Sequence, residues 1–329
     1  MSNAATAEAA PILTLSDLKK HFPVKKGLLQ KTVAHVKAVD GVSLDVKPGE
    51  TLCLVGESGC GKSTVGKLAL RLLEPTDGAI ALEGADITHL DAGAMRPHRK
   101  RIQMVFQDPY ASLNPRRTVG QIIAEPLENY TDDNAEARMA RVAELLDRVG
   151  LRPDAMRRFP FEFSGGQRQR LGIARAIALN PSVVVADEPV SALDVSVQAQ
   201  VLNLLMDLQD SLGLAYLFVS HDLGVVEHIG HRIAVMYLGR IVEIADKDDL
   251  FKNPLHPYTK ALIAAAPVPD PTVKRERIVL EGDVPSPMNP PSGCRFHTRC
   301  PFAIPRCKEE DPVLRGVGQG RRVACHLVE

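Results

Sequence analysis

A glycine-rich run around residue 60 has the residue types and the spacing of a phosphate-binding loop. Residues 56–63 read Gly-Glu-Ser-Gly-Cys-Gly-Lys-Ser and fit the pattern G-x-x-x-x-G-K-[ST]. The glycines let backbone N–H groups surround phosphate oxygens, and the helix that follows points its positive end at them. Lys62 can then reach the β- and γ-phosphates, and the Ser63 hydroxyl can ligate Mg²⁺. The run predicts a nucleotide-binding P-loop.

Two adjacent carboxylates, Asp187 and Glu188, end an apolar run of valine and alanine at residues 183–186. A carboxylate at the end of a buried strand can complete the ligand shell of Mg²⁺, which is the role predicted for Asp187. Glu188, one residue later, can polarise an attacking water as a general base. Such a pair is often only a solvated rim, but a P-loop in the same chain favours the catalytic interpretation.

A serine and two glycines at residues 164–166 precede a predicted helix that carries Leu171, Ala174 and Ile177 on one stripe. On its own this is an N-capping serine with a flexible turn. A small hydroxyl, free backbone N–H groups and a helix dipole also make a second phosphate-facing site. A chain that holds a P-loop and a second anion-facing helix start suggests that two chains share each nucleotide.

The elements that must position these residues alternate between strands and helices. Apolar or β-branched runs predict strands at residues 51–55, 102–106, 183–186, 214–220 and 233–237. Periodic apolar residues predict helices at residues 62–73 and 195–212. The first helix has Val65, Leu68, Ala69 and Leu72 on one face, and Gly213 ends the second. The alternation predicts an α/β fold with a mainly parallel sheet. Residues 108–175, rich in helix formers, predict a helical subdomain that interrupts it.

Length and composition argue against several classes of protein. At 329 residues the chain predicts about two domains. Its 40 Lys and Arg balance 40 Asp and Glu, unlike the strongly basic domain of a general nucleic-acid binder. A hydrophobic share of 45% is too high for a disordered chain. Aromatic residues make up only 4% and Trp is absent, which argues against a stacking platform for single-stranded nucleic acid.

Proline and cysteine mark a boundary near residue 251. The last 79 residues hold 12 of the 24 prolines and four of the six cysteines. Such a segment cannot be a run of regular helices and strands, and it has too little core to be stable alone. The sequence therefore predicts an α/β domain at residues 1–250 and an appended extension at residues 251–329.

No segment of the sequence predicts a membrane span or a secretion signal. No run approaches the ~18 apolar residues that a spanning helix needs. Residues 1–10 lack a basic start before an apolar stretch. We therefore expect a protein that stays in the cytosol, where its cysteines are thiols or metal ligands rather than disulfides. Cys53, in a predicted strand, and Cys60, in the P-loop, are expected to pack in the interior.

The order and spacing of these motifs across residues 12–250 resemble the ATP-binding-cassette (ABC) family. Residues 56–63 match its Walker A motif, residues 183–188 its Walker B motif, and residues 163–167 its signature, with Phe163 in place of the usual Leu. Gln107 matches the Q-loop, residues 191–194 the D-loop and His221 the switch histidine. Phe22 sits where the family stacks an aromatic ring on adenine. The resemblance implies a P-loop NTPase core with a mainly parallel sheet, an antiparallel β subdomain and a helical subdomain.

The same resemblance implies a set of site residues. The catalytic residues would be Glu188, His221, Gln107 and Asp187, and Mg²⁺ would be held by Ser63, Gln107 and Asp187. ATP would contact Phe22, Gly56, Glu57, Ser58, Gly59, Cys60, Gly61, Lys62, Ser63, Thr64, Gln107, Ser164, Gly165, Gly166, Gln167, Asp194 and His221. Two such domains would meet head to tail, with each ATP between the P-loop of one and the signature of the other. Loss of the γ-phosphate would then let the dimer open.

A closer resemblance, covering nearly the whole chain, is to the ATPase subunits of dipeptide and oligopeptide permeases, and most to the second, dipeptide-type ATPase. The matching segments are residues 114–116, 192–196, 237–243, 253–258 and the cysteine-bearing segment that begins at residue 293. The resemblance implies ATP-driven import of peptides by a peripheral subunit on the cytoplasmic face of the inner membrane. The implied partners are integral membrane permease subunits, a second ABC ATPase (identical or homologous) and, indirectly, a peptide-binding protein, with no nucleic acid.

The four C-terminal cysteines, Cys294, Cys300, Cys307 and Cys325, have the spacing C-x5-C-x6-C-x17-C. This spacing matches neither short-spaced zinc ribbons nor ferredoxin runs. Four reduced thiols and a four-thiolate metal site both stay open, and a metal site would staple a short proline-rich segment. The resemblance implies a [4Fe–4S] cluster, with zinc as the alternative. Nearby basic side chains suit an anionic cluster: Arg295, Arg299, Arg306, Arg321 and Arg322.

Two other functions compete with peptide transport. A soluble ABC ATPase that acts on DNA or ribosomes generally carries a long coiled-coil insertion or a second cassette, and the sequence shows neither. A small-molecule P-loop kinase would leave Ser164 and His221 unexplained. The sequence therefore favours an ATPase subunit of an ABC transporter.

Overall fold

The computed structural model describes residues 10–27, 30–266 and 282–328. Among these residues the larger sheet has eight strands in the order β11-β12-β10-β9-β3-β8-β7-β6. Its strands are β3 (Thr51–Val55), β6 (Ile102–Val105), β7 (Val183–Asp187), β8 (Ala215–Ser220), β9 (Arg232–Tyr237), β10 (Arg240–Asp246), β11 (Arg315–Gly316) and β12 (Arg322–Val323). Strands β9, β3, β8, β7 and β6 run parallel, and β10, β12 and β11 continue the sheet antiparallel. The predicted α/β fold with a mainly parallel sheet is therefore confirmed.

The parallel strands are buried on both faces. Every residue of β3, β7 and β8 is buried, which is why these strands read as continuous apolar runs. Successive side chains of β3 enter different cores. Leu52 and Leu54 join one hydrophobic cluster, while Cys53 and Val55 join the cluster on the opposite face.

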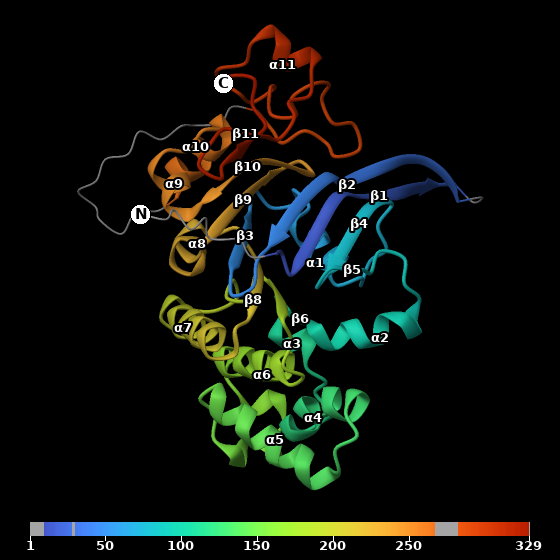
Figure 1. The fold of residues 1–329 in the computed structure, drawn as a ribbon, viewed down its shortest axis with the longest axis vertical. Helices are drawn as coiled ribbons and strands as arrows, with labels where there is room; N and C mark the ends of the chain where they lie inside the picture. The colour runs from blue at the N-terminus through green and yellow to red at the C-terminus, as the bar shows by residue number, and fades with distance from the viewer. Residues whose placement is uncertain (1–9, 28–29, 267–281, 329) are drawn as a thin grey trace, which may run out of the picture.

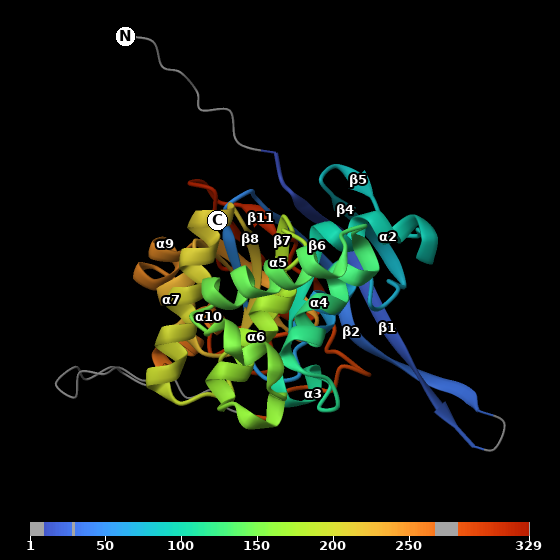
Figure 2. The same cartoon turned by 90° about the horizontal axis from the view of Figure 1, so that it is seen from below.

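A smaller antiparallel sheet covers one of these faces. Its strands, in the order β2-β1-β4-β5, are β1 (Leu13–Lys26), β2 (Lys31–Val46), β4 (Asp77–Leu82) and β5 (Ala85–Asp86). Residues of both sheets and of the first helix share one hydrophobic cluster, so that helix lies between the sheets. Figure 2 shows the far end of the β1–β2 ribbon projecting beyond the rest of the described chain.

The helices of the described chain fall into three groups (Figure 1). Those beside the sheets are α1 (Lys62–Ala69), α2 (Ala92–Arg101), α7 (Val195–Leu212), α8 (Leu223–Ile229), α9 (Lys247–Lys252) and α10 (Pro257–Ala265). Between β6 and β7 lie α3 (Pro109–Ser112), α4 (Val119–Tyr130), α5 (Ala135–Arg148), the 3₁₀ turns η1 (Pro153–Arg157) and η2 (Pro160–Glu162), and α6 (Gly165–Ile177). The C-terminal segment carries α11 (Pro305–Glu309). None of the described helices is both long and apolar enough to cross a membrane.

Most predicted elements appear within one residue of their predicted bounds, but the helix after the P-loop is shorter. It ends at Ala69, where residues 62–73 were expected, because Arg71 takes the left-handed conformation with φ +53°. Val65, Leu68 and Ala69 are buried as predicted. Leu72 lies beyond the helix and is 50% exposed, so its place on the buried face is wrong.

The helix at Val195–Leu212 matches its predicted bounds. Gly213 ends it in the left-handed conformation, with φ +65°, and donates its N–H to the Gln209 carbonyl. Leu171, Ala174 and Ile177 of α6 are all buried, as their spacing predicts.

The C-terminal extension folds against the first part of the chain. Strand β12 pairs with β10, so the larger sheet runs into the extension. In residues 282–328 regular structure is limited to α11, β11 and β12. Phe296 anchors the segment in the main hydrophobic cluster. Figure 1 shows this segment at the end of the molecule opposite to α4 and α5.

Candidate functional site

The P-loop connects β3 to α1, and two of its glycines, Gly56 and Gly61, are packed too tightly for any side chain. A Cβ on Gly61 (φ +112°) would lie 2.1 Å from the Ala38 carbonyl oxygen, and one on Gly56 would lie 2.2 Å from the Met236 carbonyl oxygen. The loop thus rests directly on β2 and β9. Lys62 Nζ is buried and donates to the carbonyl oxygens of Gly56 (2.7 Å) and Glu57 (3.0 Å). Thr64 is the third residue of α1.

Two of the three predicted Mg²⁺ ligands, Ser63 of the P-loop and Asp187 at the end of β7, lie in direct contact. Ser63 Oγ donates to Asp187 Oδ1 at 2.8 Å. Asp187 is the last residue of β7 and is 4% exposed. Burial raises the pKa of its carboxyl, the Ser63 hydrogen bond works against that rise, and the Glu188 charge adds to it. A hydroxyl and a carboxylate at hydrogen-bond distance form the oxygen donor set that Mg²⁺ prefers.

The predicted base, Glu188, is the meeting point of three predicted catalytic residues. Gln107, which follows β6, donates from Nε2 to Glu188 Oε2 at 2.9 Å. His221, which follows β8, contacts Glu188 Oε1 through Nδ1 at 3.0 Å. Glu188 itself has φ +46°, a strained conformation for a residue with a side chain, and its N–H donates to the Val219 carbonyl. Residues 107, 188 and 221 thus meet at one carboxylate.

The second predicted phosphate-facing segment lies on α6. Ser164 caps this helix in a reciprocal capping box with Gln167, and both side chains are exposed. Gly166 allows α6 to pack on the start of α7, because a Cβ there would lie 2.3 Å from Val197 Cγ1. Asp194 is exposed at the N-terminus of α7. Figure 1 shows α6 among the helices, apart from α1, so one chain does not join this segment to its own P-loop.

Phe22 lies on β1, close in the fold to the P-loop. It pairs with Val36 of β2, two residues from the Ala38 carbonyl that touches Gly61. Lys20 Nζ lies 5.3 Å from the centroid of the Phe22 ring. A partly buried aromatic ring near the phosphate loop can stack on a planar base.

Comparisons with known proteins agree with this geometry. The ABC transporter family model matches residues 39–191, and the model for the C-terminal region of oligopeptide and dipeptide transporters matches residues 242–307. A probable peptide ABC transporter ATP-binding protein, y4tS, of Sinorhizobium fredii is 59% identical over 96% of this chain and 90% of its own. The oligopeptide transport ATP-binding protein AppF of Bacillus subtilis is 56% identical over 98% of each chain. This chain belongs to the ABC transporter family.

Further matches agree with this assignment. The dipeptide transport ATP-binding protein DppF of Haemophilus influenzae is 52% identical over 98% of each chain. Among solved structures, the ADP- and Pi-bound dimer of the ATP-binding cassette MJ0796 is similar, with a TM-score of 0.64 and 30% identity. The match covers 71% of this chain and 98% of that one. The chain is therefore an ABC ATPase, as its motifs predict.

The four C-terminal cysteines of this ABC ATPase lie near one another in the structure. The Cys294 N–H donates to the Cys307 carbonyl at 2.9 Å. Burial raises the pKa of Cys294 to about 11, and the thiols of Cys307, Cys325 and Cys300 add to the rise. Yet across residues 10–27, 30–266 and 282–328, no three His, Cys, Asp or Glu side chains are arranged to hold a metal ion. The expected [4Fe–4S] cluster or zinc site therefore finds no support in the side-chain arrangement of the described residues.

The arginines beside these cysteines have other partners. Arg295 pairs with Asp40, Arg299 with Glu57, Arg321 with Glu243 and Arg322 with Asp45. These four pairs hold the extension to the first part of the chain. The sequence had instead suggested that the arginines balance the charge of a metal cluster. Cys53 and Cys60 are buried in the interior, as expected.

Sequence reasoning missed two residues of the ABC ATPase that touch the P-loop. Arg299 binds the Glu57 carboxylate, and the Tyr258 hydroxyl accepts the Glu57 N–H. Both lie more than 200 positions away along the chain. The only signal in the sequence was the glutamate inside the P-loop, because a carboxylate there favours pairing with a cationic side chain.

Proposed function

We propose that this chain hydrolyses ATP to energise the import of di- or oligopeptides through a membrane permease. The observation that carries the catalytic part is the contact of Gln107 and His221 with the Glu188 carboxylate, beside the Ser63–Asp187 pair. Peptide as the cargo is supported by relatives with peptide transport in their names that match almost the full length. The second matched family region, residues 242–307, supports the same cargo.

In this proposal the residues divide the work at the nucleotide. Lys62 and the P-loop N–H groups bind the phosphates, and Ser63, Asp187 and Gln107 hold the Mg²⁺ that arrives with ATP. Mg²⁺ neutralises charge on the transferring phosphoryl group. Phe22 stacks on the base. Glu188 accepts the proton of the attacking water, and Gln107 and His221 fix the direction of its carboxylate.

A second ATPase subunit completes the site. Ser164 and Gln167, at the start of α6, are exposed on a different part of the chain from the P-loop, which supports binding to the nucleotide of another copy. Asp194 is the N-cap residue of the adjacent α7, whose Val197 packs against Gly166. ATP between two copies holds them together, and loss of the γ-phosphate releases them.

The permease is proposed to dock beside Gln107. A groove of ≈ 660 Å³ there is lined by Phe106, Gln107, Glu125 and Tyr130, between the sheet and the helices of residues 109–177. Tyr110, next to it, is 63% exposed. Because Gln107 faces both this groove and Glu188, it can couple the two. We propose that the subunit binds its permease at the cytoplasmic face of the inner membrane. Residues 1–250 then serve as the nucleotide-binding domain and residues 251–329 as the extension.

The decisive test is Glu188→Gln in the full-length chain. ATP turnover should fall by about 10²–10⁴-fold because the proton acceptor is lost. ATP binding should persist, and the protein should elute as an ATP-dependent dimer in size-exclusion chromatography. Glu227→Gln, an exposed carboxylate on the nearby α8, is the matched control and should keep normal turnover. Normal turnover in Glu188→Gln would refute the assigned base.

A [4Fe–4S] cluster at the four cysteines stays a prediction from the resemblance alone. Protein prepared without oxygen should be brown, absorb in the visible range and contain iron. Colourless protein with stoichiometric zinc, or with neither metal, would contradict the cluster. No step of the proposed ATP hydrolysis depends on it.

A further inference from the structure

One short segment of the extension touches the P-loop through a charged pair that the proposed hydrolysis does not use. Residues 293–300, the arginine segment, carry Arg295 and Arg299. Arg299 donates from Nη1 to Glu57 Oε2 at 2.8 Å and from Nη2 to Glu57 Oε1 at 3.2 Å. The two side chains are 8% and 28% exposed. A two-point guanidinium–carboxylate contact fixes direction as well as distance.

The extension side also holds the backbone of the same P-loop residue. The Glu57 N–H donates to the Tyr258 hydroxyl at 2.9 Å. The Tyr258 ring is fully buried and packs on Tyr237 and Phe296, with centroids 4.7 and 5.4 Å away. This hydroxyl therefore has little freedom to move.

Glu57 in turn contacts Lys62, the phosphate-binding lysine. Its carbonyl oxygen accepts from Lys62 Nζ at 3.0 Å. The residue is thus held at its N–H by Tyr258, at its carboxylate by Arg299 and at its carbonyl by Lys62. A shift of Glu57 would move an acceptor of the lysine that binds the phosphates.

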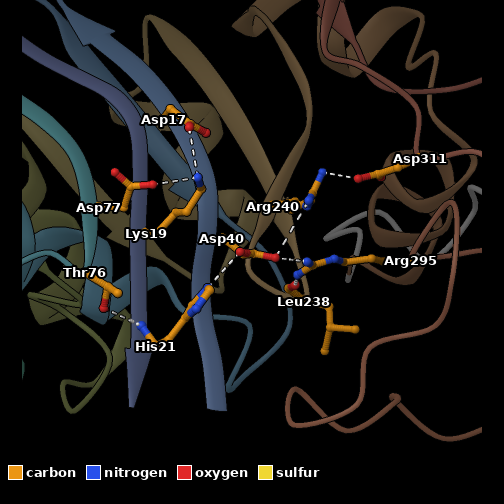
Figure 3. Close-up of polar contacts among 10 residues, drawn as sticks. All are labelled: Asp17, Lys19, His21, Asp40, Thr76, Asp77, Leu238, Arg240, Arg295 and Asp311. Carbon is orange, nitrogen blue, oxygen red and sulfur yellow. Dashed lines mark hydrogen bonds and ion pairs between the residues drawn. The ribbon is translucent and has the colours of Figure 1, made fainter. Parts of the chain in front are cut away.

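A second arginine keeps the arginine segment in place (Figure 3). Arg295 binds the Asp40 carboxylate of β2 and donates to the Leu238 carbonyl at 2.5 Å. Burial alone would raise the pKa of Asp40, but His21, Arg295 and Arg240 outweigh it and keep the carboxyl pKa low. His21 Nε2 lies 2.8 Å from Asp40 Oδ1 and is adjacent to Phe22 on β1. The segment is therefore anchored to the strands beside the nucleotide before it reaches the P-loop.

We infer that Arg299, together with Tyr258, is a positioning residue that holds the P-loop in its phosphate-binding form, so that the extension sets the affinity for MgATP. The inference rests on the proposed binding of ATP at this loop. Glycines give the loop many accessible conformations, and selecting one of them in advance strengthens binding. The chemistry at Glu188 is untouched. The expected signature is therefore a change in nucleotide affinity and KM with little change in kcat.

The test compares full-length Arg299→Ala, Arg299→Lys and Tyr258→Phe with the unchanged chain. The Kd of a fluorescent ATP analogue with Mg²⁺, and KM and kcat for ATP, are measured at a protein concentration that supports turnover. Arg299→Ala should raise Kd and KM about tenfold, with kcat within about twofold. Arg299→Lys should restore part of the affinity, because an ammonium keeps the charge but loses the two-point contact. Tyr258→Phe should weaken binding by a smaller factor.

Two controls separate positioning from general stability. Arg306→Ala removes an exposed ion pair with Glu310 (2.7 Å) in the same extension and should leave Kd unchanged. In a Glu57→Gln background, Arg299→Ala should cause little additional loss, because the arginine acts through that carboxylate. Unchanged Kd and KM in all three variants, or full loss from Arg299→Ala in the Glu57→Gln background, would overturn the inference. If Arg299→Ala does not fold, Arg299→Lys and Tyr258→Phe decide it. Failure of the unchanged chain to bind MgATP would instead refute the proposed function.

Discussion

The parallel strands of the larger sheet and the C-terminal part of the extension (residues 282–328) are held in place by different forces. In β3, β7 and β8 every residue is buried, so apolar burial on two faces fixes the strands that carry the P-loop, Asp187 and His221. In residues 282–328 the regular elements are limited to α11, β11 and β12. The contacts of this segment with the first part of the chain include four arginine–carboxylate pairs, at positions 295, 299, 321 and 322.

This difference shows how each region can position residues of the site. Apolar burial is strong but has no direction, so strand ends are further oriented by hydrogen bonds such as that of Glu188 with Val219. An arginine fork binds one carboxylate in one geometry and can tie a short irregular segment to a chosen loop. Glu243 illustrates the second mode. It is fully buried, binds Arg321, and accepts the N–H groups of Leu255 and His256.

The largest expected effect tests whether the extension also depends on an apolar anchor. Phe296 is 1% exposed and packs on Tyr237, Tyr258 and His256, with centroids 5.2 to 5.7 Å away. Phe296→Ala should lower the free energy of unfolding by about 3–5 kcal/mol, because it empties an aromatic site in the core. Chemical denaturation followed by circular dichroism measures the change.

Phe302 provides the matched control in the same segment. It is 57% exposed, so Phe302→Ala should cost less than about 0.5 kcal/mol. Equal losses for the two variants would show that the extension is not anchored through Phe296. The contrast between the two regions would then rest on arginine pairs alone.

Local patterns in the sequence predicted most of the fold and the composition of the site. Strands buried on both faces read as apolar runs, and Gly213 marks the end of α7. The ends of the parallel strands lie at one edge of the sheet, which is why Gln107, Glu188 and His221 could be expected to meet. The exception is the end of α1, because apolar periodicity continues to Leu72 while the backbone leaves the helix at Arg71.

Pairs between distant residues could not be predicted. Arg299 and Glu57 are 242 positions apart, and Arg295 and Asp40 are 255 apart. Many arginines and carboxylates satisfy the same charge rule, so no single pairing can be read from residue types. Because Arg295 and Arg299 lie beside cysteines in the sequence, they suggested counter-charges for an anionic cluster. In the structure both guanidinium groups instead bind carboxylates of the first part of the chain.

A smaller effect, and one that depends on pH, is expected from His256 at the junction of the two regions. It caps α10, is 1% exposed, and accepts the Tyr258 N–H through Nδ1 at 3.0 Å. Burial lowers the pKa of His256 to about 3, from about 6.5 in an exposed histidine. Between about pH 3 and pH 6.5, His256 binds a proton in the unfolded chain but not in the folded chain. The contribution of the neutral imidazole to the free energy of unfolding is therefore fully present above about pH 6.5 and is lost as the pH falls.

The loss should amount to about 1.4 kcal/mol per pH unit below about 6.5, or ~2 kcal/mol at pH 5. His256→Asn keeps a side-chain acceptor for the Tyr258 N–H but cannot titrate in this range. Relative to the unchanged chain, its free energy of unfolding should therefore fall less between pH 7.5 and pH 5. His35→Asn, at an exposed position of β2, should leave the pH dependence as it was. Parallel curves for the unchanged chain and His256→Asn would show that the imidazole charges freely in the folded protein. In that case the junction between sheet and extension would be open to water rather than sealed by apolar packing.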